Sequence, residues 1–161
     1  TLENVEGMSL EALEAGLGDD WGFETFPEYL DAIERRGMAI NLGVLIGHTP
    51  LRMYVMGEDA VERPATPDEV ARMRDLVREA LEAGAVGFAT SKAITHWGYA
   101  GKPVPSRLAE LDEIEELSSP VGEVGGMVQV NVGPSFYLKE LSRIARRTGR
   151  HIVAVVEARR I

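Results

Sequence analysis

Short apolar runs alternate with helical patterns along this chain, and this alternation constrains the fold more than any other feature. The apolar runs have the length of single strands and lie at residues 39–46, 85–90, 127–132 and 152–156. A helix between consecutive strands predicts parallel pairing through right-handed crossovers. The fold class is therefore α/β, with a parallel sheet built from repeated βα units.

Hydroxyl residues, prolines and glycines mark the helix ends. Thr25-Phe26-Pro27-Glu28 and Thr66-Pro67-Asp68-Glu69 each combine a capping hydroxyl, an early proline and a glutamate at the third helical position. The helices that they open are predicted to end at Gly37 and Gly84.

Two further helices are expected in the second half, one with apolar residues from Leu108 to Leu117 and one from Leu138 to a stop at Gly149. Segments 47–65 and 91–107 are then the irregular stretches long enough to serve as active-site loops.

Two ways of closing the sheet remain open: an open doubly wound sheet, as in the flavodoxin type, or part of an eight-stranded barrel. A closed barrel typically takes about 250 residues, and this chain has 161. If the fold is a barrel, the chain holds about half of one as a single segment, residues 1–161. Open strand edges and uncovered apolar faces would then favour oligomerisation or pairing with the remainder of the barrel.

Composition excludes several classes of function. A net charge of -9, from 26 acidic and 17 basic residues, argues against nucleic acid or an anionic membrane surface as partner. The chain has no cysteine, so disulfides and thiolate metal sites are excluded. No apolar run approaches the roughly 20 residues of a membrane span, and the first residues lack the pattern of a signal peptide. We expect a cytoplasmic protein.

The most informative polar residues follow the run at 85–90. Lys92, His96 and Arg107 would gather at the carboxyl end of that strand, where α/β proteins keep their chemistry. Lys92 is a cation for a substrate carboxylate or a loop lysine. His96 is a candidate catalytic proton carrier or part of a self-packed loop. Arg107 suits bidentate carboxylate binding, or pairs with the acidic residues Glu110 or Asp112.

A second pair of candidates follows the first apolar run. His48 and Arg52 lie four residues apart, and they either orient a substrate carboxylate or brace the loop. His151 opens the last strand beside Arg150 and is expected at the surface.

Several stretches in order carry a family resemblance. They are Trp21-Gly22-Phe23-Glu24-Thr25-Phe26-Pro27-Glu28-Tyr29-Leu30, Asn41 with Gly47-His48-Thr49-Pro50-Leu51-Arg52, Val55-Met56-Gly57, the run from Glu79 to Phe88, and Pro105-Ser106-Arg107 before Glu110-Leu111. In register over about residues 1–149, the chain resembles the N-acyl-D-amino-acid deacylase (D-aminoacylase) branch of the amidohydrolase superfamily.

The resemblance implies a TIM barrel of which this chain would hold about strands 3 to 6, a zinc cofactor, and hydrolysis of the amide bond of an N-acyl-D-amino acid. The wider amidohydrolase superfamily adds a third role for Lys92, a carboxylated lysine bridging two metals, where the D-aminoacylases use a cysteine of an earlier strand instead. The resemblance places Asn131 where the family has a metal-binding histidine, although an amide is a poor zinc ligand beside imidazole. The ligand set is therefore incomplete in this chain, and we expect the 161 residues alone to be inactive. The alternative is a degenerate, non-catalytic homologue that acts as a binding or assembly partner.

Overall fold

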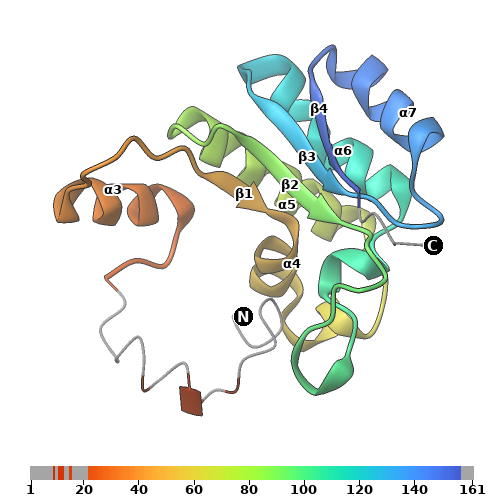
Figure 1. The fold of residues 1–161 in the computed structure, drawn as a ribbon, viewed down its shortest axis with the longest axis horizontal. Coiled ribbons are helices and arrows are strands. Elements are labelled where there is room, and N and C mark those ends of the chain that lie inside the picture. The colour runs from red at the N-terminus through yellow and green to blue at the C-terminus, as the bar shows by residue number, and fades with distance from the viewer. Residues whose placement is uncertain (1–8, 10, 13–14, 16–21, 157–161) are drawn as a thin grey trace.

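Four parallel strands lie side by side in chain order in the described part of the protein (Figure 1). The computed structural model describes residues 9, 11–12, 15 and 22–156. In chain order the elements are α3 (Phe26–Arg36), β1 (Leu45–Gly47), α4 (His48–Met56), η1 (Gly57–Val61), α5 (Pro67–Glu82), β2 (Gly87–Ser91), η2 (Tyr99–Gly101), η3 (Pro105–Leu108), α6 (Leu111–Val124), β3 (Met127–Asn131), α7 (Leu138–Thr148) and β4 (Ile152–Val155).

The strand order β1-β2-β3-β4 confirms the predicted parallel sheet of βα units. Sequential order is what a barrel segment requires. It contradicts the flavodoxin-type alternative, because the strand order of such a sheet reverses around a central strand.

Strand β1 is much shorter than the strand expected over residues 39–46. Only Leu45–Gly47 pair with β2, although the Val86 amide still donates to the Val44 carbonyl oxygen at 2.8 Å. Residues 39–43 form no ladder with any described residue, and the apolar side chains of Ile40 and Leu42 are exposed. The other three strands lie close to their predicted bounds.

The capping chemistry of the first two predicted helices is confirmed. Thr25 and Thr66 each form a capping box with the glutamate three residues later, and a proline stands in the first turn of both helices. Helix α7 stops at Gly149, as predicted, and this glycine caps it in the left-handed conformation. Helix α6 begins later than expected, at Leu111, because Leu108 closes the separate turn η3.

The segment 47–65, expected to be an irregular active-site loop, contains helix α4 and the turn η1 instead. Gly47 gives α4 no side-chain cap, and Pro50 stands in its first turn, where no amide donor is needed. Both residues favour a loop when the sequence is considered alone. Burial of Leu51 and Met56 against the rest of the protein holds the short helix in place.

The two faces of the sheet differ sharply in burial. Ile46, Phe88 and Val128 are in register on one face, and they form the core with apolar residues of α4, α5, α6 and α7. The opposite face carries Met127 and Val153, which are 37% and 43% exposed. Exposure of this second face is expected for a partial barrel, because the inner face of its sheet lacks the strands that would otherwise cover it.

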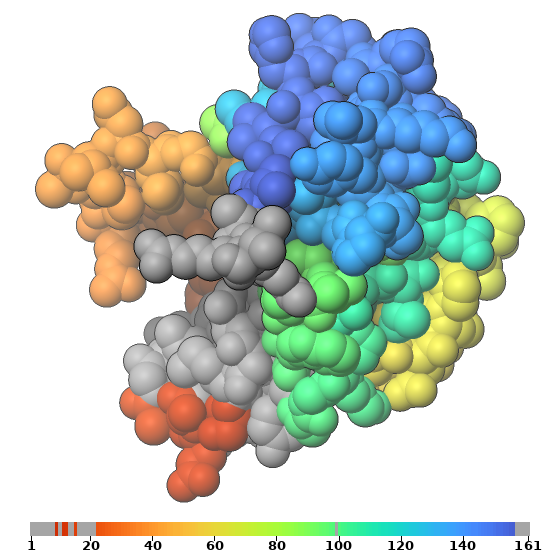
Figure 2. Space-filling model, turned by 45° about the vertical axis from the view of Figure 1, so that its right-hand side comes forward, coloured from red at the N-terminus to blue at the C-terminus, as the bar shows by residue number. Residues whose placement is uncertain are grey.

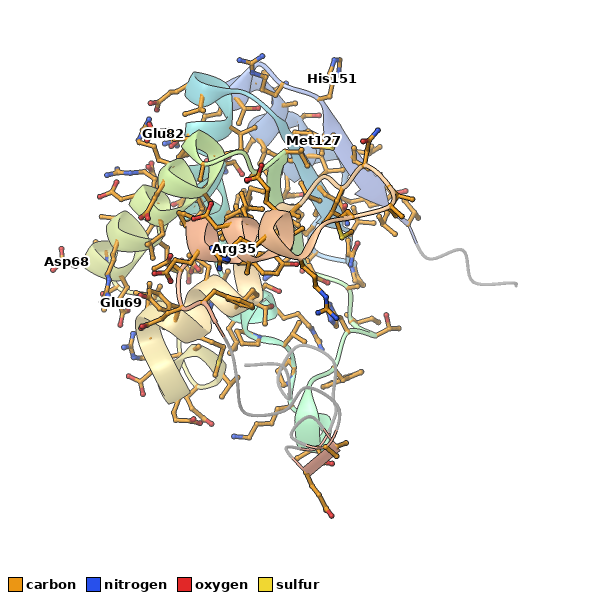
Figure 3. All side chains as sticks on the ribbon, turned by 90° about the vertical axis from the view of Figure 1, so that its left-hand side faces the viewer. Arg35, Asp68, Glu69, Glu82, Met127 and His151 are labelled. Carbon is orange, nitrogen blue, oxygen red and sulfur yellow. The ribbon has the colours of Figure 1, made fainter. Side chains whose placement is uncertain are left out.

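Helix α5 runs opposite to the strands, so its last residue lies where the strands begin. Figure 3 shows Glu82 at the same end of the molecule as Met127 and His151, far from Asp68 and Glu69 at the start of α5. His151 is exposed at this end, as predicted. The carboxyl ends of the strands, with the candidate site, therefore lie at the other end.

Helix α3 is peripheral. It has no buried residue, although Phe26 packs against the core, and in the space-filling view it forms a lobe at the edge of the molecule (Figure 2). No helix in the described part of the chain is long and apolar enough to cross a membrane.

Candidate functional site

A small pocket lies at the carboxyl ends of β2, β3 and β4. Its volume is about 260 Å³, and its lining comprises Ala93, Thr95, His96, Asn131 and Val155. Asn131 and Val155 are aligned with Ser91 across the three strands, so all three residues stand at the same level of the sheet. The register thus places residues of consecutive strands in one pocket, which His96 lines but Lys92 and Arg107 do not.

His96 is the imidazole of this pocket. Its Nδ1 lies 2.9 Å from Oγ of Ser91, a contact between the loop and the end of β2. Its amide donates to the Ala93 carbonyl oxygen at 3.1 Å, and its own carbonyl oxygen accepts from Nη1 of Arg107 at 3.4 Å. Side chain and main chain of His96 are therefore both held.

Lys92 uses its ammonium group to fasten the loop. Nζ donates to the carbonyl oxygens of Arg107 and Ala109, at 2.6 and 2.7 Å. Burial lowers the pKa of this amine. Carboxylation of Nζ would set an anion against two carbonyl oxygens, so the geometry favours the ammonium form.

Arg107 lies over an aromatic ring rather than beside an acid. Its guanidinium carbon is 4.5 Å from the centre of the Trp97 ring, a cation–π contact. The expected pairing with Glu110 or Asp112 is not made in the described part of the chain. The reason is the conformation of η3, which is held by Lys92 and directs Arg107 towards the loop.

His48 and Arg52 belong to a buried network on the helix-covered side of the sheet. Nε2 of His48 lies 2.9 Å from Oε1 of Glu113, and its Nδ1 lies 2.8 Å from Oγ1 of Thr90. Nη1 of Arg52 donates to both carboxylate oxygens of Glu113, at 2.6 and 2.7 Å. The exposed fractions of His48 and Arg52 are 1% and 0%.

The electrostatics of this network follow from its burial. Burial lowers the pKa of His48, which favours the neutral ring. For Glu113, burial alone would raise the pKa, but the hydrogen bond from His48 and then Arg52 outweigh it and hold the pKa below its usual range. Glu113 is therefore a buried carboxylate whose charge Arg52 balances.

Sequence reasoning did not single out Glu113 or Ser91. Glu113 had a usable signal, because with Leu117 and Val121 it repeats every four residues on the buried face of α6. An acidic residue on an apolar helix face indicates a buried partner. Ser91 had none, because serine is common in loops.

The described residues do not fit a complete metal site. No group of three histidine, cysteine, aspartate or glutamate side chains within them lies close enough to hold one ion. Asn131 reaches the pocket, but its amide is a weak ligand for zinc, and the Lys92 ammonium is engaged by two carbonyls.

Sequential parallel strands with a pocket at their carboxyl edge define the chain as a segment of the βα-barrel class. No family model matches it. Individual relatives do, including a D-aminoacylase of Alcaligenes xylosoxydans xylosoxydans, 34% identical over 140 residues that cover 87% of this chain. An N-acyl-D-glutamate deacylase of the same organism is 33% identical over 147 residues, or 90% of this chain.

Solved structures agree. The N-acyl-D-glutamate deacylase of Bordetella bronchiseptica, complexed with zinc and a phosphonate inhibitor that mimics the tetrahedral intermediate, superposes with a TM-score of 0.69 at 28% identity, over 91% of this chain and 30% of that one. A D-aminoacylase described as defining a novel subset of amidohydrolases gives a TM-score of 0.65 at 30% identity, over 82% of this chain and 27% of that one. The chain belongs, as a segment, to the N-acyl-D-amino-acid deacylase branch of the amidohydrolase superfamily.

The chain spans about a quarter of the length of these curated relatives, 24% of the D-aminoacylase and 28% of the N-acyl-D-glutamate deacylase. A binuclear metal centre is described for D-aminoacylase, and zinc is present in the Bordetella enzyme. Metal dependence is thus a property of the relatives.

Proposed function

We propose that the protein containing these residues hydrolyses the amide bond of N-acyl-D-amino acids, and that residues 1–161 form one incomplete portion of its catalytic barrel. The observation that carries this proposal is the pocket at the carboxyl edge of the sheet, within a segment homologous to deacylases. Active sites of βα barrels lie at that edge.

The pocket suits part of such a substrate. The Asn131 amide and the His96 ring provide hydrogen-bonding groups for the oxygens of a carboxylate or an acyl carbonyl, while Ala93 and Val155 offer apolar contact. Trp97, half exposed on the same loop, is placed to extend the apolar wall towards an acyl chain. The described residues do not complete a site for zinc.

The other candidate residues serve as supports in this proposal. Lys92 and Arg107 hold the loop that carries His96, through two carbonyls and through the ring of Trp97. His48 and Arg52 brace α4 against α6 from within the protein, and their burial keeps them from substrate. Direct contact with substrate is assigned to His96 and Asn131.

One observation favours a second candidate, a non-catalytic homologue that binds a ligand or partner. The described residues contain no three-ligand metal group, and Asn131 is a weak ligand. The two candidates differ in turnover: a binding protein would retain N-acyl amino acids without releasing the free amino acid. A cytoplasmic location is a prediction common to both.

The test is hydrolysis of N-acetyl-D-amino acids by the intact protein, with the L-enantiomers as the control substrates. We expect turnover of the D-forms and a loss of about a hundredfold in His96→Ala, the scale seen when one preorganised hydrogen-bond donor is removed. His151→Ala, at the opposite end of the strands, is the matched control and should retain full activity. Absence of turnover with stoichiometric binding would support the non-catalytic candidate, and equal loss in both variants would refute the assignment of His96.

A further inference from the structure

Ser91 stands at the meeting point of the sheet and the loop that carries His96. It is the last residue of β2, and its neighbours across the sheet are Asn131 and then Val155, which both line the pocket. Its Oγ contacts Nδ1 of His96 at 2.9 Å. A rigid strand end is thus joined to the one loop imidazole of the pocket.

Ser91 is well suited to act as an anchor. It is 5% exposed, its carbonyl oxygen accepts from Oγ of Ser106 at 3.0 Å, and its backbone pairs with β3. A serine side chain has a single torsion between the backbone and its oxygen, so a fixed backbone fixes the hydroxyl closely. The His96 ring, in contrast, is borne by a loop five residues further on.

The hydrogen-bonding needs of the Ser91 hydroxyl indicate which of the two groups is the donor in its contact with His96. Within the described residues, the Ser91 hydroxyl has one hydrogen-bond contact, to Nδ1 of His96. A buried hydroxyl that does not donate its proton leaves that donor unsatisfied, which is costly. The arrangement that satisfies this donor has Ser91 donating to Nδ1 of the neutral ring, with the ring proton on Nε2.

We propose that Ser91 is the positioning residue of this site: it fixes the orientation of the His96 ring and selects the tautomer that carries its proton on Nε2. With that tautomer, the Nε2–H of neutral His96, a residue that lines the pocket, is a hydrogen-bond donor and suits an acceptor oxygen, such as the carboxylate or acyl oxygen of an N-acyl amino acid. This ligand chemistry rests on the proposed function, whereas the tautomer does not.

The tautomer can be measured directly because the chain contains only three histidines. Nitrogen-15 NMR of the imidazole rings in the full chain, with signals assigned through His→Gln variants, separates protonated from unprotonated ring nitrogens. For His96 we expect an acceptor-type Nδ1 and a protonated Nε2 in the neutral ring. A neutral His96 protonated at Nδ1 would overturn the assignment.

Substitution then tests the role of the serine. Ser91→Ala should shift the Nδ1 resonance of His96 towards the average of a freely exchanging ring, and Ser91→Thr should restore it by restoring the hydroxyl. Ser142→Ala, an exposed position on α7, is the matched control and should change nothing. The signals of buried His48 report whether each variant keeps its fold.

The outcomes separate this inference from the proposed function. Unchanged His96 resonances in a folded Ser91→Ala chain would refute the positioning role. Shifted resonances that Ser91→Thr restores would support it, even if the intact protein neither binds nor hydrolyses N-acetyl-D-amino acids, a result that would count against the proposed function alone.

Discussion

Neutralising Glu113 should destabilise the protein far more than neutralising an exposed acid. The Arg52 side chain is 0% exposed, and the Glu113 side chain that balances its charge is 4% exposed. Glu113→Gln keeps the size of the side chain but leaves the guanidinium buried without a counter-charge. Breaking one partner of a buried ion pair costs about 3–5 kcal/mol. Because glutamine still offers His48 and Arg52 a carbonyl oxygen, we expect the lower end, about 3 kcal/mol.

The assay is urea unfolding of the full chain, with stability taken from the midpoint and slope. Glu62→Gln is the matched control, because Glu62 pairs with Lys102 at 2.9 Å but both side chains are more than half exposed, at 63% and 54%. Its midpoint should not change measurably. The double variant Arg52→Met/Glu113→Leu removes both charges and should recover part of the stability that Glu113→Gln loses. Equal midpoints for Glu113→Gln and Glu62→Gln would refute the reasoning.

Three further predictions concern packing, pH and association. Gly133→Ala should lower the free energy of unfolding by about 3 kcal/mol or prevent folding, as strongly overpacked substitutions do. The reason is that the alanine Cβ would lie 1.9 Å from the Lys92 carbonyl oxygen. Gly22→Ala is the control, because Gly22 has open space around it, and this variant should unfold in urea like the parent. The hydrogen bond from Arg63, followed by those at Thr66, lowers the pKa of Glu69 from 4.5 to about 2. This carboxylate therefore stabilises the fold above pH 4.5 and loses that effect as the pH falls towards 2. The parent should have a lower urea midpoint at about pH 3 than at about pH 5, and Glu69→Gln should make this difference smaller. An unchanged difference would contradict the lowered pKa of Glu69. Sedimentation should show the isolated chain associating through its open sheet face, and a stable, cooperatively unfolding monomer would contradict that expectation.

Element order and strand pairing were predictable because they depend on patterns local to the sequence. The capping boxes at Thr25 and Thr66 are formed by residues that are close in sequence. The parallel pairing of the strands follows from the helices that separate them in the chain. Helix α4 was not predictable in this way. Gly47 and Pro50 favour a loop, and it is the burial of Leu51 against the core that stabilises the helix.

The location of the candidate site was also predictable, whereas the partners of its side chains were not. Strand counting places Lys92, His96 and Asn131 near one edge of the sheet. It does not reveal that a lysine donates to carbonyls fifteen and seventeen residues away, or that Arg107 covers a tryptophan. A long cationic side chain can reach several possible partners, so the conformation of the folded loop decides which of them it contacts.

Because these cations hold the loop, the geometry around His96 is specified within this segment of the barrel. Lys92 fixes the carbonyls at positions 107 and 109, Arg107 holds the His96 carbonyl, and Ser91 contacts the ring; each contact joins residues of this chain. Within the described residues, this wall of the site therefore carries several supports for its imidazole. The ring of His96 should therefore be ordered before substrate arrives, which is the condition under which a hydrogen-bond donor contributes most to binding a developing charge.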